Sequence, residues 1–291
     1  MVNSLAIVGA GRVGRALAKR LREESWRIGA VVTRSDSTAR KAVRFIGTGR
    51  PCAGISREVL AARVVLIATP DDQIAPVAQQ IINLLETAGN DSLCGTVVFH
   101  TSGALDSGVL KTLKQHGAAV GSLHPLQTFS GVGVPPLEGR LFAIEGDPAA
   151  IRVARKIVHC LGGRAVKLGA GKKRLYHAAA ALAAGHVLAV EEAATRMLMS
   201  AGLKRAEAVA ALLGLTRQVL DNFERLGSRA AWTGPLSRGD YRVILAHGEA
   251  MSDLPVEYTQ AYEALNRLGA RVLASDAKST LARLGKIAAS K

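Results

Sequence analysis

Short apolar runs alternate with amphipathic stretches along the first two thirds of the chain. Each run predicts a buried strand, and the runs lie at residues 5–8, 28–33, 64–68, 97–100, 118–122, 141–144 and 165–167. Between the first two runs, residues 12–24 place Val13, Leu17 and Leu21 on one side, which predicts a helix. The step Asp147-Pro148 predicts the start of another helix. Strands that alternate with helices predict an α/β fold with a mainly parallel, doubly wound sheet.

The pattern changes near Gly171, where the strand-like runs stop. Residues 173–201 are apolar, rich in alanine and free of proline, which predicts one long helix. Further helices are predicted at residues 206–226, 243–251, 256–268 and 275–286. We therefore expect an α/β domain at residues 1–168 and an all-α domain at residues 169–291. Because the long helix is apolar on all sides, it should be buried in its own domain or in a subunit interface.

Composition narrows the class of protein. The 291 residues include 38 Lys and Arg against 23 Asp and Glu, a formal charge of +15. The basic residues are scattered, without a basic run or zinc-finger spacing, so nucleic-acid binding is not favoured over attraction of phosphate-bearing cofactors and acidic substrates. The three cysteines, Cys52, Cys94 and Cys160, fit no metal site or disulfide framework and are typical of a cytoplasmic protein. The longest apolar runs are too short to predict a membrane span.

A glycine motif stands between the first predicted strand and the first predicted helix. Residues 9–14 spell Gly9-Ala10-Gly11-Arg12-Val13-Gly14, the G-x-G-x-x-G pattern of dinucleotide-binding turns. Gly9 permits the tight turn, Gly11 lets a diphosphate approach the backbone, and Gly14 lets helix and strand pack closely. The helix N-terminus offers its N–H groups and positive dipole end to phosphate. The alternative is a structural glycine turn, but the position between strand and helix favours a dinucleotide site.

The end of the second strand indicates which dinucleotide is bound. NAD-binding proteins usually place an Asp or Glu there, whereas this chain has Thr33-Arg34-Ser35. A guanidinium and hydroxyls suit a ribose 2′-phosphate, so NADP is predicted over NAD. Asp36, just beyond the predicted strand end, is the main argument for NAD. Thr69-Pro70 ends another strand and should border the cofactor, while Asp72 is expected to cap the following helix.

Three segments at strand ends or the long helix carry candidate catalytic groups. His124-Pro125 is expected on a stiff loop, where a histidine can move a proton during hydride transfer. Lys173 and His177 are four residues apart and share a helix face, and Lys173 could neutralise a substrate oxygen or carboxylate. Ser102 follows the strand that ends at His100. The alternatives are a loop brace for His124, a surface position for Lys173, a core role for His177 and a turn role for Ser102.

A dense turn at residues 233–240 lies between two predicted helices. Two glycines and a proline account for its backbone but not for Arg238 and Asp240. These two side chains could form an ion pair, cap the next helix or reach an active site.

Together these motifs resemble a bacterial family. It comprises Rossmann-like proteins with a C-terminal domain of unknown function, described as candidate NADP oxidoreductases. The resemblance rests on residues 9–14, 33–34, 69–71, 100–103, 121–125, 173–178 and 233–240. It implies a C-terminal domain like that of 6-phosphogluconate dehydrogenase and a homodimer formed through it. Lys173 also matches the catalytic lysine of β-hydroxyacid dehydrogenases, and His124-Pro125 is similar to the catalytic His-Pro step of prephenate dehydrogenases.

Two functions follow as competing hypotheses. The first is an NADP-dependent oxidoreductase that moves hydride to or from a small, anionic substrate in the cleft between the domains. Its proton would pass through His124 or Lys173. The second is a non-catalytic NADP-binding sensor or assembly protein, because the fold alone can serve either role.

Overall fold

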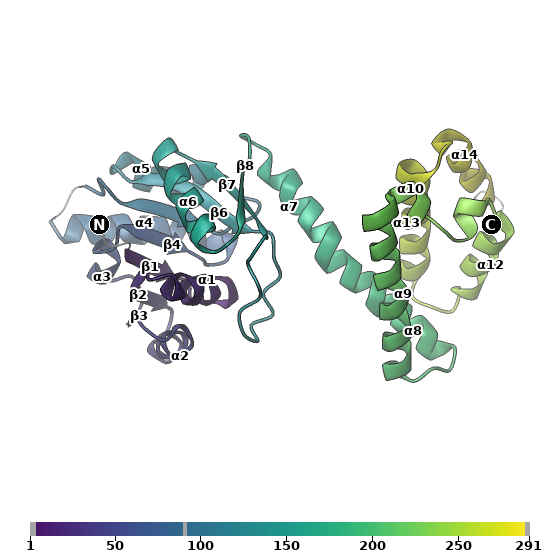
Figure 1. Cartoon of the computed structure of the whole chain (residues 1–291), viewed down its shortest axis with the longest axis horizontal. Helices are drawn as coiled ribbons and strands as arrows, with labels where there is room; N and C mark the ends of the chain where they lie inside the picture. Colours follow the sequence, from purple (N-terminus) through teal and green to yellow (C-terminus); the bar gives the residue numbers. More distant parts are fainter. Residues whose placement is uncertain (1–3, 90–91, 289–291) are drawn as a thin grey trace. The chain divides into compact units, whose positions relative to one another are not determined.

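The computed structural model describes residues 4–89 and 92–288 (Figure 1). Two compact units make up the chain, Met1–Ala184 and Gly185–Lys291. The boundary predicted at residue 168 follows the change in sequence character, and it lies shortly before the helix that begins at Lys173. It stays a prediction about domains, because a compact unit is defined by contacts and a domain by independent folding.

An eight-stranded sheet forms the centre of the first unit. Its spatial order is β3-β2-β1-β4-β5-β6-β7-β8, and the first six strands in this order run parallel. This is the strand order of a Rossmann domain extended by two strands. β7 runs antiparallel to β6 and parallel to β8. The strands are β1 (Ser4–Val8), β2 (Arg27–Thr33), β3 (Arg50–Ala53), β4 (Val64–Ile67), β5 (Val97–His100), β6 (Ala119–Pro125), β7 (Leu141–Gly146) and β8 (Arg164–Lys167).

Both faces of the sheet are covered, which explains why its central strands are apolar throughout. Leu5 and Ile7 of β1 point into one core with α1, α2 and α6, whereas Ala6 and Val8 point into the other with α3, α4 and α5. A strand buried on both faces needs no polar alternation. The helices of this unit are α1 (Arg12–Glu23), α2 (Asp36–Ile46), α3 (Arg57–Leu60), α4 (Asp71–Thr87), the 3₁₀ turn η1 (Ser107–Leu110), α5 (Lys111–Gln115), α6 (Pro148–Cys160) and α7 (Lys173–Ala181).

Two features of the sheet differ from expectation. The short edge strand β3 was not predicted, because its four residues include Pro51 and its burial is partial. His124 lies inside β6 rather than on a loop. The reason is the antiparallel partner β7, which pairs Ala143 with His124 and Phe142 with Pro125 and so extends β6 by three residues beyond the predicted end.

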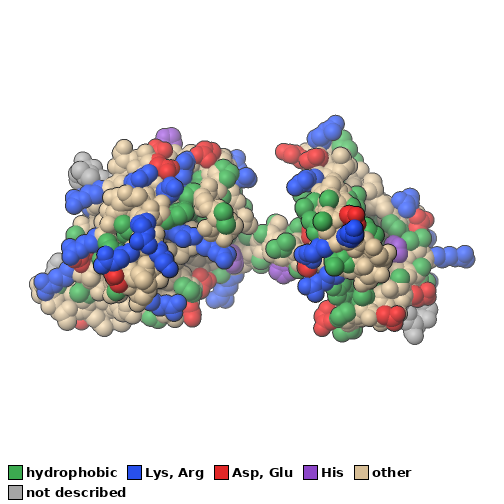
Figure 2. All heavy atoms as spheres, turned by 90° about the horizontal axis from the view of Figure 1, so that it is seen from below, with side chains coloured by type: hydrophobic (Ala, Val, Ile, Leu, Met, Phe, Trp, Pro, Cys, Tyr) green, Lys and Arg blue, Asp and Glu red, His purple; other side chains and the backbone are tan. Residues whose placement is uncertain are grey.

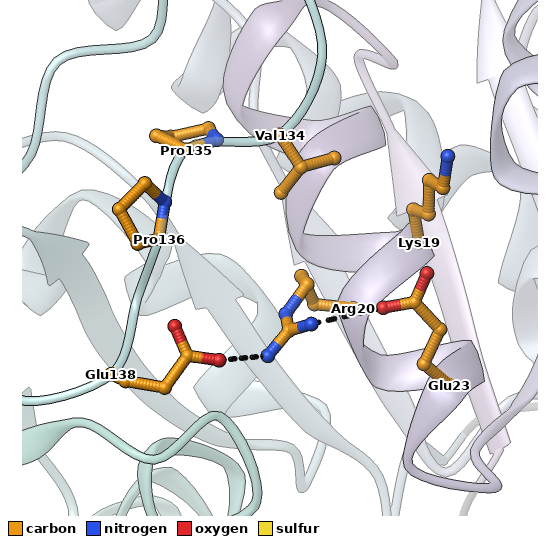
Figure 3. A pocket seen from close by; sticks show the side chains of 7 residues that line it. All are labelled: Lys19, Arg20, Glu23, Val134, Pro135, Pro136 and Glu138. Atoms are coloured by element: carbon orange, nitrogen blue, oxygen red, sulfur yellow. Dashed lines mark hydrogen bonds and ion pairs between the residues drawn. The ribbon is translucent and has the colours of Figure 1, made fainter.

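The segment between β6 and β7 is fastened to α1 at two points. The Arg15 guanidinium donates to the Gly131 carbonyl oxygen at 2.8 Å. Further along, Arg20 pairs with Glu138 and, at 3.1 Å, with Glu23 of its own helix (Figure 3). These charges line a surface cavity of about 420 Å³ beside Pro135 and Pro136. These contacts hold the segment that follows β6, the strand of His124, against α1.

The second unit is all-helical, as predicted. Its core is small: Leu236, Ile244, Ala270 and Leu284 are buried, with Trp232 packed against them. None of the helices in the described residues is long and apolar enough to cross a membrane. The helices are α8 (Val187–Ser200), α9 (Arg205–Leu226), α10 (Ser228–Ala231), α11 (Pro235–Arg238), α12 (Tyr241–Ala250), α13 (Val256–Leu273) and α14 (Ala277–Ala288).

The long helix predicted at residues 173–201 is continuous but not uniform. A π-helical turn, η2 (Leu182–His186), joins α7 to α8. Most side chains along this stretch are exposed in the single chain, including Leu175 at 73% and Leu188 at 71%. The prediction that this helix is buried within its own domain is therefore wrong. The prediction that it is buried in a subunit interface stays open as a prediction. The three cysteines are free thiols, and the cytoplasmic location stays a prediction.

Candidate functional site

The glycine turn predicted to bind a diphosphate joins β1 to α1. Gly9 has a φ of +90°, and a Cβ there would come within 2.7 Å of the Ala68 carbonyl carbon. A Cβ on Gly14 would press on the Gly9 oxygen and lie 3.0 Å from the Ala68 Cβ. By contrast, a Cβ on Gly11 would meet no heavy atom within 4 Å. Two glycines thus serve close packing, and the third faces open space.

The N-terminus of α1 is free of competing acceptors. Gly11 is its N-cap, with no side chain to accept from the first N–H groups, and the first turn contains no acidic residue. These N–H groups have no partner within the helix and carry the positive end of its dipole. Ala10 lies in the turn, and Arg12 and Val13 are the first two residues of the helix. The Arg12 side chain is exposed. The open space above Gly11 therefore adjoins unpaired donors, which is the environment that a diphosphate needs.

The end of β2 presents hydroxyl groups and an exposed guanidinium. The Thr33 hydroxyl donates to the Ser35 carbonyl oxygen at 2.8 Å, and Ser35 caps α2 by accepting from the Thr38 N–H at 3.4 Å. Arg34 is exposed. Asp36 is the first residue of α2, and its carboxylate pairs with the Arg40 guanidinium at 2.6 Å. The carboxylate that argued for NAD is thus engaged, although it remains close to the candidate ribose site.

The β4 end lies beside the glycine turn. A Cβ on Gly9 would touch Thr69 Cγ2 at 2.8 Å, so Thr69 borders the turn as expected. The Thr69 hydroxyl is buried and has no partner among the described residues. Pro70 is the N-cap of α4, and no side chain caps this helix. The expected cap by Asp72 is wrong, because Asp71 and Asp72 both lie inside the first helical turn.

A polar cluster lies on the α3–α5 face of the sheet, at the ends of β5 and β6. Lys173, the first residue of α7, is only 1% exposed, and its ammonium donates to the Ser102 carbonyl oxygen at 2.6 Å. Lys173 is therefore an interior group, and its alternative as a surface residue is wrong. The ammonium has three donors, and one of them has this acceptor among the described residues.

Two histidines and a tyrosine adjoin the lysine. His124 Nδ1 lies 2.9 Å from the Tyr176 hydroxyl, and its ring meets the His177 ring edge-on at 5.5 Å between centroids. Gly103 lies beneath both histidines: a Cβ there would come within 2.9 Å of His124 Nε2 and closer still to His177 Nδ1. The structure thus brings two of the predicted catalytic residues, His124 and His177, together against one glycine.

The Ser102 hydroxyl is fully used by hydrogen bonds within its turn. It donates to the Asp71 carboxylate at 2.8 Å and accepts from the N–H groups of Ala104 and Leu105 at 3.1 and 2.9 Å. Its carbonyl oxygen, not its hydroxyl, contacts Lys173. Ser102 therefore has three connections. Its hydroxyl binds Asp71 of α4, its N–H donates to His100 at the end of β5, and its carbonyl oxygen accepts from Lys173.

Burial shifts the ionisation of the cluster. It lowers the pKa of His124 to about 4, with the nearby His177 and Lys173 charges adding to the effect. Burial also lowers the pKa of Lys173 to about 8, opposed by the carboxylates of Glu145, Asp106 and Asp71. The pKa of Tyr176 is raised to about 12 by burial. At neutral pH the cluster therefore holds a neutral imidazole, a protonated phenol and an ammonium that can lose its proton at mildly alkaline pH.

A surface cavity of about 510 Å³ opens beside this cluster. Its polar wall is formed by His124, Tyr176, His177 and the loop residues Gln127 and Thr128. Leu126 and the alanines of α7 and η2, which are Ala179, Ala180, Ala181, Ala183 and Ala184, form the rest. The lining contains no Asp, Glu, Arg or Lys among the described residues. The cavity offers hydrogen-bonding groups on one side and an apolar wall on the other.

Some functional candidates were missed or placed differently by sequence reasoning. Tyr176 was noted only as part of a motif, although its position three residues after Lys173 on one helix was a usable signal. The role of Gly103 could not be found without tertiary contacts. Arg238 and Asp240 form an exposed ion pair at 3.0 Å in the second unit, so the ion-pair alternative is confirmed for this turn. No group of side chains able to hold a metal is found in the described part of the chain.

Comparisons with known proteins agree with this architecture. A model of a Rossmann-like domain matches residues 2–125, and a model of the domain of unknown function DUF2520 matches residues 140–268. No curated protein matches the chain. A candidate NADP oxidoreductase from Bacteroides fragilis superposes with a TM-score of 0.75 at 22% identity, covering 92% of this chain and 97% of that one.

Two further solved structures share the fold. Protein TM1727 from Thermotoga maritima has a TM-score of 0.66 at 24% identity and covers 98% of both chains. A reductive aminase from Aspergillus terreus, in complex with NADPH and ethyl-5-oxohexanoate, has a TM-score of 0.60 at 16% identity over 100% of this chain and 94% of that one. At these identities the likeness establishes the fold. The chain therefore belongs to the group of proteins in which a Rossmann-like domain is followed by this C-terminal domain of unknown function.

Proposed function

We propose that this protein is an NADP-dependent oxidoreductase that reduces a carbonyl or imine carbon, or catalyses the reverse oxidation. The observation that carries the proposal is the glycine turn, with open space over Gly11 and an uncapped helix N-terminus behind it. NADP would supply the hydride when bound. The B. fragilis protein is described as a candidate NADP oxidoreductase, and the A. terreus enzyme was solved with NADPH. Both descriptions support the choice of reaction and cofactor.

The residues of the polar cluster would handle the proton and the developing charge. The Lys173 ammonium, with a pKa of about 8, can donate a proton at neutral pH or stabilise a developing oxyanion. His124 stays neutral, so it acts with Tyr176 as a donor–acceptor pair rather than as a cation. His177 completes the polar wall. Ser102 would position Lys173 through its carbonyl oxygen instead of touching substrate.

We further propose that the substrate is small and anionic. The net charge of +15 favours an anion, and the apolar cavity wall suits a short carbon skeleton. Calorimetric titration with NADPH and NADH, followed by a screen of carbonyl, imine and hydroxyacid compounds for NADPH turnover, tests this assignment. Failure to bind either dinucleotide would reject it. Tight NADPH binding without any turnover would instead favour the sensor hypothesis.

Arg34 is expected to carry the preference for NADP. Because a charge-assisted hydrogen bond to the 2′-phosphate contributes about 1.5–3 kcal/mol, Arg34→Leu should weaken NADPH binding roughly 10- to 100-fold and leave NADH binding unchanged. Titration of both cofactors measures the ratio. Arg44→Leu is the matched control, since Arg44 is an exposed arginine in the last turn of α2. Equal losses in the two variants would contradict the role of Arg34.

We also propose that the protein is a homodimer formed through its C-terminal helices. Large apolar side chains lie exposed on the second unit, including Leu188 at 71%, Leu215 at 64% and Val272 at 61% (Figure 2). Such surface is usually covered by a partner. Light scattering should give the mass of two chains, and Leu188→Asp should shift the mass toward one chain. Val132→Asp is the control, because Val132 is equally apolar and exposed in the first unit. A monomeric wild-type protein would refute the proposal.

A further inference from the structure

Nearly all buried polar side chains of the described residues gather under the candidate site. Of the six, Thr195 lies on α8, and the others are His100, Ser102, Ser107, Ser122 and Lys173. Buried polar groups are costly unless they are paired, so a cluster of them requires a reason. His100 is the ionisable member of this group that the mechanism above does not use. It is the last residue of β5 and is 0% exposed.

The hydrogen bonds of His100 fix its protonation. Its Nδ1 accepts the Ser102 N–H at 3.2 Å, so Nδ1 carries no proton and the neutral ring is protonated at Nε2. Burial lowers the pKa of His100 to about 3, and the Lys173 ammonium and His124 lower it further, while the Asp106 backbone opposes them. His100 is thus an uncharged acceptor across the physiological pH range. It is not a pH switch or an acid at the reacting centre.

The turn after His100, at residues 101–103, is held by hydrogen bonds to neighbouring elements. The Thr101 N–H donates to the Ile67 carbonyl oxygen of β4 at 3.0 Å, and the Ser102 hydroxyl donates to Asp71 of α4. The bond from the Ser102 N–H to His100 fixes the orientation of the peptide that precedes Ser102. The carbonyl oxygen of Ser102 then receives the Lys173 ammonium at 2.6 Å. The next residue, Gly103, supports the rings of His124 and His177.

We propose that His100 is a positioning residue: its neutral imidazole fixes the Ser102 turn and thereby places the Lys173 ammonium and the two histidines above Gly103. The placement of Lys173 is a property of the folded chain alone, and only its catalytic consequence rests on the proposed function. His100 would touch neither cofactor nor substrate. Substituting it should therefore change the environment of Lys173 before it changes anything else.

Charged and titratable groups face Lys173 from several elements. Loss of the Ser102 acceptor would free the ammonium to move toward solvent or a carboxylate, and its pKa would return toward the ordinary value of about 10.4. The groups that would then compete for it are Asp71 of α4, Asp106 before η1, Glu145 of β7, His100 of β5 and His124 of β6.

The test measures the reactivity of Lys173 in the full chain. Acetic anhydride labels deprotonated amines, and peptide mass spectrometry reports the extent at Lys173, with the exposed neighbour Lys172 as internal reference. In the wild type, labelling of Lys173 should be slow, with an inflection near pH 8. In His100→Leu, which lacks the acceptor, labelling at pH 10 should be at least about 10-fold faster, and the inflection should move upward. Labelling as slow as in the wild type, with an unmoved inflection, would overturn the proposal.

Two further variants separate positioning from general destabilisation. In His100→Asn the amide oxygen can stand in for Nδ1 and accept the Ser102 N–H, whereas in His100→Gln the amide extends toward the Nε2 position. His100→Asn should therefore keep Lys173 protected and His100→Gln should not, at similar melting temperatures. Equal labelling of Lys173 in these two variants would reject the role of Nδ1. Since neither cofactor nor turnover enters the measurement, failure of the oxidoreductase assignment would leave its result standing.

Discussion

Replacing Gly11 with aspartate is expected to weaken NADP binding by at least about 100-fold, or about 2.7 kcal/mol, while leaving the fold intact. The space above Gly11 is open, and its backbone is extended at φ −72° and ψ −159°, so a side chain meets no steric barrier in the free protein. The carboxylate would occupy the position of the diphosphate and repel it. Aspartate is also a favourable N-cap, so the melting temperature should stay equal or rise. Calorimetry and thermal unfolding measure the two quantities.

The contrast with Gly14 makes this prediction specific. Gly14→Ala places a methyl group against the backbone oxygen of Gly9, and this oxygen cannot easily move away. Overpacking of this kind costs about 1–3 kcal/mol of stability. One glycine is thus needed for the ligand and the other for the fold. NADP affinity unchanged in Gly11→Asp would mean that the diphosphate does not lie at this turn, and the assigned cofactor site would have to be abandoned.

Lys173→Met is expected to reduce turnover about 10²–10⁴-fold with little change in NADPH affinity. The methionine fills a similar volume but can neither donate a proton nor stabilise an oxyanion. Lys172→Met, one residue earlier and exposed, is the matched control and should retain activity. Steady-state kinetics on any substrate from the screen provide the comparison. Full activity in Lys173→Met would remove the lysine from the mechanism.

The same variant gives a signed effect on stability. The folded-state pKa of Lys173, about 8, lies below its unfolded value of about 10.4. Between these values the unfolded chain binds the extra proton, so the free energy of unfolding of the wild type should rise with pH across this window. Relative to Lys173→Met, the rise should approach about 3 kcal/mol, and below pH 8 the difference should be constant. Denaturant unfolding of both proteins at a series of pH values measures it, and parallel curves would contradict the shift.

Local signals in the sequence were sufficient for much of the fold and the cofactor turn. The glycines at 9, 11 and 14 act within a single turn, so their spacing carries most of the information needed. The buried strands of the sheet are continuous apolar runs, which explains why β1, β2, β4 and β5 were found nearly to the residue. The helices of the second unit were likewise set by periodicity and by turn residues.

Features that depend on distant segments were not predictable. The extension of β6 through His124 and Pro125 requires β7 as a partner, and nothing local distinguishes these residues from a loop. Similarly, the sequence was compatible with either a surface or an active-site position for Lys173. Its buried position depends on the fold, which brings the Ser102 carbonyl oxygen to its ammonium. His100 acts through a bond from its ring to a backbone N–H, and Gly103 acts through close contacts with two rings, and neither role has a signal in the local sequence. The sequence provided candidate reactive groups but not the residues that hold them in place.

The two units divide their buried apolar surface unequally. Two extensive cores hold the first unit together on both sides of its sheet, whereas the core cluster of the second unit has four buried apolar side chains among the described residues. A helical assembly with so small a core has little free energy of its own to oppose chain entropy. If its exposed leucines and valines complete their burial against another copy, mass action makes the folding of this half rise with protein concentration. Dilution would then loosen the helices of the second unit while the first unit stays folded.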